Sequence, residues 1–406
     1  MSKIVVLGGC GGIGSVAVRG LVSGDYFDEL VIADVRAEVA QRTAAALGKP
    51  GVRGVGVDAL DRNSLHATIS GADVVLNCIG PFYKFGPPVL QAAIDARIPY
   101  VDVCDDLAPT RRMLEMDTAA SSAGVAALIG MGNSPGLANV FARLCADQLL
   151  DQVESVDIMH IHGGEPEEGP AVVKHRIHAM VNDVPLFIDG GFINVRQLEA
   201  SGQAYVQQTE FRDIGTFPVY PYPHPETITL PQHIAGLRRA TNLGVVFPLS
   251  YFHLTQEMVR VGACSDTPMR VQGQEVIPLE FSVAHILARR PQLLREAGIN
   301  GPAGCLKVVV GGRKQGESQT LVLSLSSKTA GAGEGTGIPA AVGAILMQRG
   351  RITRRGVFPP EAAVQPFEVL ALANEIGKQL GVASGGSVHV EHIDASGKRT
   401  PIPLGI

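Results

Sequence analysis

The chain opens with KIVVLGGCGGIGSVAVRGL (residues 3–21), and this stretch carries the strongest structural signal in the sequence. The apolar run Ile4 to Leu7 predicts a buried strand, and a glycine-rich turn leads from it directly into a helical pattern. Gly9, Gly11 and Gly14 satisfy the GxGxxG spacing. In such a turn the first glycine permits the tight bend, the second lets the backbone approach a pyrophosphate, and the third lets the helix pack close to the sheet. The sequence therefore predicts a dinucleotide-binding turn.

The start of the following helix is the predicted phosphate site. Unpaired amides and the positive end of the helix dipole can hold two phosphates there without a lysine. The sequence contains neither GKS nor GKT, which excludes a P-loop. We expect the cofactor to contact five residues of the turn: Gly9, Gly11, Gly12, Ile13 and Gly14.

An acidic residue stands where a dinucleotide-binding fold places its ribose ligand. Asp34 ends the second predicted strand, and its carboxylate can accept hydrogen bonds from the adenosine ribose. This favours NAD over NADP, because a 2′-phosphate would meet like charge. Arg36 lies two residues later and can rotate in to offset that charge, so use of both cofactors stays open.

Apolar strand-like runs alternate with helix-like stretches as far as Gly130. Short, nearly all-apolar strands of this kind are typical of a parallel sheet covered by helices on both faces. We therefore predict an α/β fold with a doubly wound parallel sheet. Cys78, Ile79 and Gly80 end the fourth strand, near the expected nicotinamide. Asp58 ends the third strand, where it fits either a contact with adenine or a helix N-cap.

Composition excludes several classes of protein. With 46% hydrophobic residues in 406, the chain can bury sizeable cores, so disorder is excluded. The net charge of −5 and the lack of long Lys or Arg runs argue against nucleic-acid partners. No run of about 18 apolar residues is present, so no membrane span is expected. Six scattered cysteines without a CxxC pair, and no secretory signal, favour a reduced cytoplasmic setting.

The pattern changes after Pro135, where GLANVFARLCADQLL predicts a helix. We predict a dinucleotide-binding domain over 1–134, an α+β domain with a mixed sheet over 135–335, and C-terminal helices and a tail over 336–406 that pack back on the first domain. The expected strands of the second part are Val153–Ile161, Met258–Cys264 and a hairpin of Leu306–Val310 with Thr320–Leu325. The expected helices are Phe281–Ala297, Ile338–Met347 and Phe367–Leu380, followed by a last strand in SVHVEHID.

Several longer motifs resemble the saccharopine dehydrogenase-like oxidoreductases. The likeness lies in NCIGPFYKFGPPVLQAAIDARIPYVDVCDD (77–106), GMGNSPGLANV (130–140), YPYPHPETITLP (220–231), VVVGGRKQGES (308–318), GTGIPAAVGA (335–344) and ITRRGVFPPE (352–361). The resemblance implies a Rossmann domain joined to an α+β substrate and dimerisation domain. It also implies a homodimer that uses NAD or NADP on a carbon bonded to nitrogen. The same motifs serve saccharopine, lysine and carboxylated polyamine substrates, so the reaction class is implied more strongly than the substrate.

Hydride transfer requires a cofactor ring held against the substrate carbon and a group that handles a proton. We expect these groups on the loops after the fourth to sixth strands, which converge at the carboxyl edge of the sheet. The catalytic candidates are Tyr83, Lys84, Cys104 and Asp105. Asp105 would bind a cationic substrate nitrogen, while Lys84 or a thiol takes the proton, provided that burial shifts its pKa toward neutrality.

These residues also fit structural roles. Lys84 fits a solvated loop position, and Cys78 and Cys104 fit small buried apolar residues. Asp102 fits a ligand for neighbouring amides, and Asp106 fits the cap of the next helix.

Ser134 fits either a contact with cofactor or substrate or an ordinary helix entry. The resemblance favours the contact, so we count Ser134 among the cofactor-binding residues.

Polar residues of the second part offer further candidates. His224, His233 and Arg238 are the expected ligands of a substrate carboxylate, since Arg offers a bidentate fork. Two pairs of histidines could be metal ligands, but neither pair has a third ligand at a spacing typical of a metal site. We interpret His160 and His162 as a sheet-surface pair near Glu165 and His175 and His178 as a solvated helix face, and we predict no metal.

Two alternatives to an amine oxidoreductase differ in class. A short-chain dehydrogenase needs a tyrosine followed four residues later by lysine, and none of the seven tyrosines has one. A catalytically silent nucleotide sensor or structural oligomer would keep the fold without the chemistry. Amine-dependent formation of reduced cofactor separates this last alternative from an enzyme, whereas cofactor binding does not.

Overall fold

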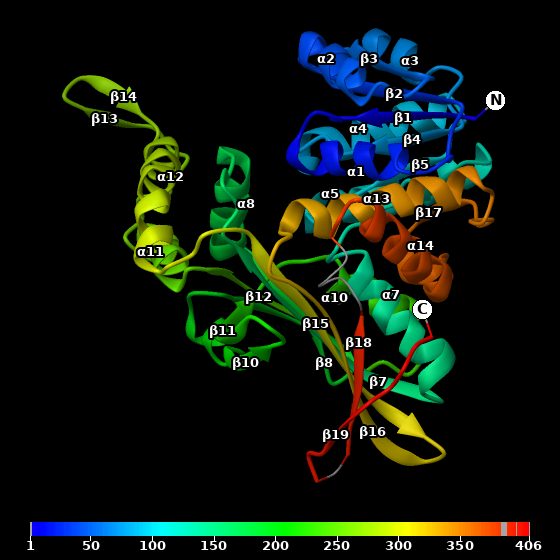
Figure 1. The fold of residues 1–406 in the computed structure, drawn as a ribbon. Coiled ribbons are helices and arrows are strands. Elements are labelled where there is room, and N and C mark those ends of the chain that lie inside the picture. The colour runs from blue at the N-terminus through cyan, green and yellow to red at the C-terminus, as the bar shows by residue number, and fades with distance from the viewer. Residues whose placement is uncertain (1, 383–387, 395, 406) are drawn as a thin grey trace.

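The computed structural model describes residues 2–382, 388–394 and 396–405, and these residues form two large sheets (Figure 1). The N-terminal sheet has seven strands, all parallel, in the order β17–β6–β5–β4–β1–β2–β3. Its strands are β1 (Lys3–Leu7), β2 (Glu29–Asp34), β3 (Val52–Gly56), β4 (Val74–Asn77), β5 (Tyr100–Asp102), β6 (Ala126–Leu128) and β17 (Gly356–Phe358).

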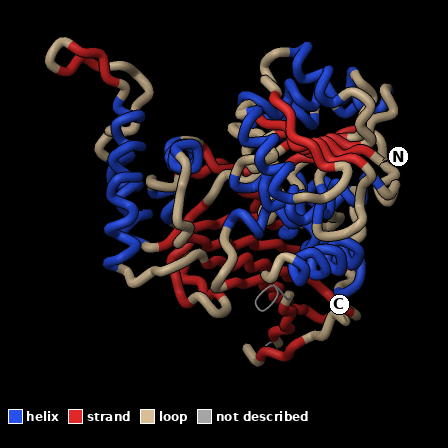
Figure 2. The backbone as a smooth tube through the Cα atoms, turned by 45° about the horizontal axis from the view of Figure 1, so that its top comes forward, coloured by secondary structure: helices blue, strands red, loops and turns tan. Residues whose placement is uncertain are grey.

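Helices cover both faces of this sheet (Figure 2). They are α1 (Gly12–Val22), α2 (Ala37–Leu47), α3 (Arg62–Ile69), α4 (Phe82–Asp95), α5 (Leu107–Leu114), α6 (Asp117–Ser122), α13 (Ala332–Gln348) and α14 (Pro366–Gln379). The predicted doubly wound α/β domain is thereby confirmed, and its carboxyl edge places the loops after β1, β4 and β5 side by side.

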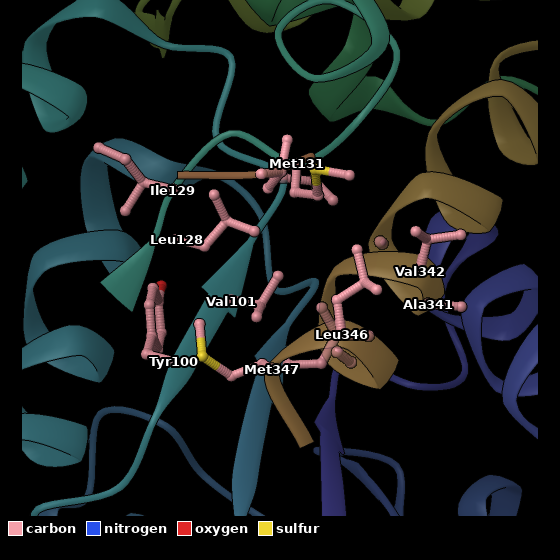
Figure 3. Packing of buried hydrophobic residues seen from close by; sticks show 14 of the residues in the cluster. Tyr100, Val101, Leu128, Ile129, Met131, Ala341, Val342, Leu346 and Met347 are labelled. Atoms are coloured by element: carbon pink, nitrogen blue, oxygen red, sulfur yellow. The ribbon is translucent and has the colours of Figure 1, made fainter. Parts of the chain in front are cut away.

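The C-terminal helix α13 is part of the N-terminal core. Figure 3 shows its Leu346 beside Val101 of β5 and its Met347 beside Tyr100 of the same strand. Val342 is fully buried and Leu346 nearly so. The glycine-rich start of α13 also lies against α1, where a Cβ on Gly337 would stand 2.6 Å from the Cβ of Val16. Residues from both ends of the chain therefore line the predicted cofactor side.

The second sheet has ten strands and is mixed, because β7 and β12 run parallel while the other pairs are antiparallel. Its strands are β7 (Gln152–Gly163), β8 (Asp183–Ile188), β9 (Gly191–Arg196), β10 (Gln207–Phe211), β11 (Gly215–Pro221), β12 (Arg239–Phe247), β15 (Ala303–Lys314), β16 (Glu317–Ser327), β18 (His389–Ile393) and β19 (Arg399–Pro401). The predicted α+β part with a mixed sheet is confirmed.

The helices of the second part are α7 (Leu137–Leu144), α8 (Pro170–Val181), α9 (Ala200–Gln203), α10 (Glu226–His233), α11 (Leu249–Arg260) and α12 (Pro278–Glu296). Short helical turns η1 (Cys145–Leu149) and η2 (Pro360–Ala362) complete the inventory of described helices, and β13 (Met269–Val271) with β14 (Gln274–Val276) forms a separate hairpin. No helix within the described residues has the length and apolarity to cross a membrane.

One strand prediction is wrong. Met258–Cys264 forms the last turn of α11 and the turn after it. Its apolar residues Met258, Val259 and Cys264 pack on the second core as side chains of a helix end. A short apolar run gives the same signal in a strand and in one side of a helix, which explains the error. The hairpin, the three helices and the last strand are present; Ser387, the first residue of SVHVEHID, lies outside the described residues.

The predicted third segment, 336–406, is divided between the two sheets. Helices α13 and α14 pack with α1, and β17 extends the N-terminal sheet through β6. Strands β18 and β19 instead continue the second sheet beyond β16. The predicted boundaries at 134 and 335 remain predictions.

Candidate active site

A cavity of about 1510 Å³ lies between the carboxyl edge of the N-terminal sheet and the second part. Gly11, Gly12 and Ile13 line one end, and the loops after β4 and β5 line its middle. The far wall comes from β7, α8 and the segment before α10. Pockets for small ligands typically enclose about 300–1,000 Å³, so this space suits a dinucleotide together with a substrate.

The glycine turn, residues 8–14, brings the start of α1 to the cavity. Gly8 is the residue with a positive φ, +74°, so it makes the bend that we assigned to Gly9. Gly9 is required for space instead, because a Cβ there would stand 2.8 Å from Cγ2 of Ile32. At Gly14 a Cβ would stand 2.1 Å from the Gly8 carbonyl oxygen, so Gly14 is required for the close approach of the helix to the turn itself, whereas we expected it to serve the approach of the helix to the sheet.

The first turn of α1 is open toward the cavity. Its N-cap Gly11 supplies no side-chain cap, and a Cβ on Gly12 would meet no atom within 4 Å. The first amides of a helix have no partners within the helix, and they attract anions. This geometry fits a pyrophosphate held by backbone amides.

Asp34 stands beside the glycine turn and is held there by Arg36. Cys10 N donates to Asp34 Oδ2 at 3.2 Å, and Arg36 Nε donates to Oδ1 at 3.0 Å. Burial favours the neutral acid, but the hydrogen bonds from Arg36 outweigh it and lower the pKa of the Asp34 carboxyl. The Arg36 side chain is 55% exposed, so the arginine is free to turn toward a ligand.

The other predicted cofactor residues differ in position. Cys78, Gly80 and Ser134 line the cavity. Ile79 donates its amide to Asn77 Oδ1 at 3.0 Å and lies behind that wall. Asp58 is exposed and outside the cavity wall; its Oδ1 accepts from Leu60 N at 2.9 Å, and the cap of α3 is Asp61 rather than Asp58.

A buried network supports the loops from below. Asp102 is completely buried and accepts from Gly130 N at 2.7 Å, from Cys104 N at 3.0 Å and from the Tyr100 hydroxyl at 2.9 Å. Burial raises the pKa of Asp102 to about 6 despite these donors. Asp102 therefore ties neighbouring amides, as its alternative interpretation predicts, and fixes the loop that carries Asp105.

A histidine of α8 joins the two carboxylates after β5. His175 Nδ1 lies 2.9 Å from Asp106 Oδ1, and Nε2 lies 3.8 Å from Asp105 Oδ2. Burial alone would lower the pKa of His175, but the two carboxylates outweigh burial and raise it to about 9. Burial raises the pKa of Asp105. His175 is thus a cation at neutral pH, and the expectation of a solvated helix face is wrong for it.

Three aromatic rings complete the wall. His160 of β7 stacks on His224 with ring centres 5.0 Å apart, and Tyr222 meets both rings edge-on. We call His160, His175, His224 and Tyr222 the histidine wall. Burial lowers the pKa of His160 to about 3 and that of His224 well below its usual range, so both rings are neutral at physiological pH.

Behind the histidine wall lies a buried polar cluster. Ser134 Oγ contacts His224 Nδ1 at 3.2 Å and the Glu226 carboxylate, and Asn242 Nδ2 donates to Ser134 Oγ at 3.0 Å. Glu226 is completely buried, and burial raises the pKa of its carboxyl to about 8. A carboxyl that changes charge near neutral pH is suited to proton transfer.

The four catalytic candidates do not converge. Tyr83, at the start of α4, and Asp105 line the cavity. Lys84 is exposed, outside the cavity wall, and lies 5.1 Å from the ring centre of Phe85. Cys104 is buried with Sγ 3.5 Å from Thr110 Oγ1, and burial raises the pKa of its thiol well above the usual value.

Of the three expected carboxylate ligands, the structure brings only His224 to the cavity. His233 ends α10, and Arg238 is exposed just before β12, outside the cavity wall. His162 pairs with Glu165 at 3.5 Å, whereas His178 is exposed on α8.

Sequence reasoning missed Glu226, Asn242 and Tyr222 as site residues. YPYPHPET contains two of them, Tyr222 and Glu226, but the sequence offers only its histidine as a ligand. Ligand atoms of Asp105, His175 and His224 lie within 4.8 Å of one another, a spacing at which a cation can be held. Our expectation of no metal remains a prediction.

The parallel sheet, the glycine turn and Asp34 at the end of β2 are the features of a dinucleotide-binding fold. Residues 4–128 match the family model of the saccharopine dehydrogenase NADP binding domain. This match confirms the resemblance found in the motifs, and the chain is similar to saccharopine dehydrogenase-like NAD(P)-dependent oxidoreductases.

Relatives match along most of the chain. Carboxyaminopropylagmatine dehydrogenase of Synechocystis sp. is 24% identical over 397 residues, which cover 93% of this chain and 96% of that protein. Carboxynorspermidine synthase of Vibrio alginolyticus is 23% identical over 385 residues, covering 87% and 90%. Among solved structures, saccharopine dehydrogenase (L-Glu forming) of Saccharomyces cerevisiae has the same fold, with a TM-score of 0.67 at 16% identity over 97% of this chain and 100% of that chain.

Proposed function

We propose that the protein transfers hydride between a nicotinamide cofactor and a carbon bonded to nitrogen in a small amine, amino acid or cyclic imine. The observation that carries this proposal is the joint cavity, which is lined both by the first residues of α1 and by the paired carboxylates after β5. Two relatives whose names refer to carboxylated amines support the substrate class.

We propose that the glycine turn and Asp34 hold the cofactor, which supplies the hydride acceptor or donor. Amides of Gly12 and Ile13 would bind the diphosphate, and Asp34 would accept from the adenosine ribose. Asp34 supports a preference for NAD. Arg36 would also allow NADP to bind, since its side chain can leave Asp34 and bind a 2′-phosphate.

We propose that Asp105 binds the cationic nitrogen of the substrate. Its carboxylate lines the cavity beside His175, whose positive charge is already held by Asp106 at 2.9 Å. The pair of carboxylates therefore keeps one negative charge for a second cation. A cation held here would also keep the reacting carbon near the nicotinamide side, which includes Gly80 and Ser134.

We propose a homodimer in a cytoplasmic setting. The hairpin β13–β14 projects from the body (Figure 1), and exposed Met269, Val271 and Phe281 on it and on α12 favour contact with a second copy. All six cysteines are free, which is typical of reduced compartments. Analytical ultracentrifugation tests the dimer: a mass of one chain at micromolar concentration contradicts it.

The substrate experiment is a panel of amino acids, diamines, opine-type secondary amines and cyclic imines, each with NAD and NADP. Turnover is followed at the nicotinamide absorbance. We expect at least one amine to support turnover, and D105N to raise its KM about tenfold or more through loss of the charge-assisted contact, with cofactor Kd unchanged. The isosteric change E115Q, on the segment after α5, is the control. Binding of reduced cofactor without turnover of any panel member would instead indicate a nucleotide sensor.

A further inference from the structure

The buried cluster behind the histidine wall forms a continuous chain from Glu226 to the cavity. Glu226 Oε1 accepts from Ser134 Oγ, and Ser134 Oγ lies 3.2 Å from His224 Nδ1. His224 and Ser134 line the cavity. The links come from two parts of the sequence, since Ser134 precedes α7 whereas His224 and Glu226 lie together at the start of α10.

Asn242 fixes the middle of this chain. Its Nδ2 donates to Ser134 Oγ at 3.0 Å and to Glu226 Oε1 at 3.3 Å, and its Oδ1 pairs with His160 Nε2 at 3.0 Å. A serine hydroxyl has one proton to donate and two lone pairs to accept. With one lone pair taken by Asn242, Ser134 can accept one further proton and donate one.

Two arrangements therefore satisfy Ser134 equally. In the first, protonated Glu226 donates to Ser134, and Ser134 donates to His224 Nδ1, so His224 carries its proton on Nε2. In the second, His224 Nδ1 donates to Ser134, and Ser134 donates to ionised Glu226. The two arrangements differ by one proton on the chain, and every group within it keeps its hydrogen bonds.

We propose that Glu226, Ser134 and His224 form a proton relay that opens on the cavity. In the direction of reduction, His224 Nε2 gives its proton to the substrate nitrogen or oxygen, His224 Nδ1 takes the Ser134 proton, and Ser134 takes the Glu226 proton. Glu226 is left as a carboxylate. Oxidation runs the same transfers backward, and Glu226 ends protonated. His224 stays neutral throughout, which suits a ring stacked on neutral His160.

The surroundings make Glu226 the end of the relay that stores the proton. Glu226 is completely buried, and burial raises its pKa to about 8, with Glu361 and Asp105 adding to that rise. The titratable groups that face His224 are His160, His162, His175, Tyr222, Glu226 and Asp105, and the charge of the Asp105 carboxylate is shared with His175. Among these, His175 carries a positive charge, which disfavours a second charge on His224. The proton is therefore kept as a neutral carboxylic acid and not as an imidazolium.

The relay rests on the proposed function, because it supplies the proton that amine or imine chemistry needs. It assigns that step to residues that line or back the cavity, in place of the exposed Lys84. Its structural prediction holds without any substrate: the tautomer of His224 must follow the ionisation of Glu226.

The first test is nitrogen NMR of the histidine-labelled protein without ligand, with His224 assigned by its loss in H224Q. We expect His224 to carry its proton on Nε2 at pH 7 and on Nδ1 at pH 9, either side of the Glu226 pKa of about 8. E226Q should abolish the switch, since an amide releases no proton in this range. One tautomer at both pH values in the wild type overturns the relay, whatever the substrate panel shows.

The second test uses any amine that the panel identifies. General acid and base catalysis typically contributes about 10²–10⁴-fold, so E226Q should lower kcat at least tenfold while KM and cofactor Kd stay within about twofold. The inflection of kcat with pH should disappear, and S134A should show the same loss.

The matched control is E361Q. Glu361 is also a buried carboxyl, with Oε2 accepting from Asn139 Nδ2 at 2.8 Å, and it lies outside the relay. We expect E361Q to keep kcat within about twofold and to retain the pH inflection, moved to lower pH because Glu361 helps to raise the pKa of Glu226. Retention of the inflection separates a relay from a general need for buried acids. An unchanged kcat and pH profile in E226Q overturns the relay while leaving the proposed function standing.

Discussion

The two ends of the cavity are built in different ways. At the glycine turn the groups that we propose to bind a ligand are backbone amides, and a few neighbouring residues supply them. At the histidine wall the groups are side chains, and they come from β7, α8 and the segment before α10. A backbone site depends on local conformation, whereas a side-chain site depends on how distant segments pack. Substitutions at the glycine turn should therefore act by changing the backbone conformation and stability. Substitutions at the histidine wall should act by changing charge and hydrogen bonding.

The largest expected effect is at the glycine turn. In G14A the new Cβ would stand 2.1 Å from the Gly8 carbonyl oxygen, which forces α1 away from β1. Overpacking typically costs about 1–3 kcal/mol, and contact with backbone places this change at or above the upper end. We expect a lower free energy of unfolding in urea and loss of NAD(P)H binding. The control G12A meets no atom within 4 Å and should unfold like the wild type.

At the histidine wall the next effect depends on pH. The pKa of His175 is raised from 6.5 to about 9, so protonation stabilises the folded protein. This stabilisation is fully present below pH 6.5 and is lost as pH rises through 9. H175Q should therefore be less stable than the wild type at pH 6, and the difference should shrink toward pH 9.5. Urea unfolding at several pH values measures it; a difference that grows with pH would contradict the pairing with Asp105 and Asp106.

This contrast explains how far sequence reasoning reached. The glycine turn and Asp34 are adjacent to strands in a repeating pattern, so their positions follow from local sequence. The pairing of His175 on α8 with Asp106 after β5 joins residues far apart in the sequence, and a helical histidine carries no local sign of it. Glu226 resembles any first-turn acid of a helix, and its burial depends on β12 and Ser134. The same limit explains the wrong strand prediction for Met258–Cys264, because only its packing on the second core distinguishes a helix end from a strand.

A smaller effect on cofactor binding is expected at Arg36, whose side chain lies beside the glycine turn. Arg36 is bonded to Asp34 but is half exposed, and we propose that it turns toward a 2′-phosphate. R36A should weaken NADPH binding about tenfold, in line with loss of one charge-assisted contact, and change NADH binding by less than about twofold. Fluorescence titration of both reduced cofactors tests this. An equal loss for both would place Arg36 in support of Asp34 alone.

The smallest expected effect is at Lys84, the residue for which sequence and structure differ most. The sequence offers Lys84 as a proton acceptor, but its side chain is exposed and lies near Phe85, outside the cavity wall. Surface substitutions away from a site usually change stability by less than about 0.5 kcal/mol. K84Q should therefore keep kcat, KM and the pH profile within about twofold of the wild type. Tyr83 next to it lines the cavity, so Y83F is the paired variant that reports on the same turn of α4. A tenfold loss of kcat in K84Q, with its pH inflection removed, would mean that α4 moves when substrate binds and would return the proton step to this helix.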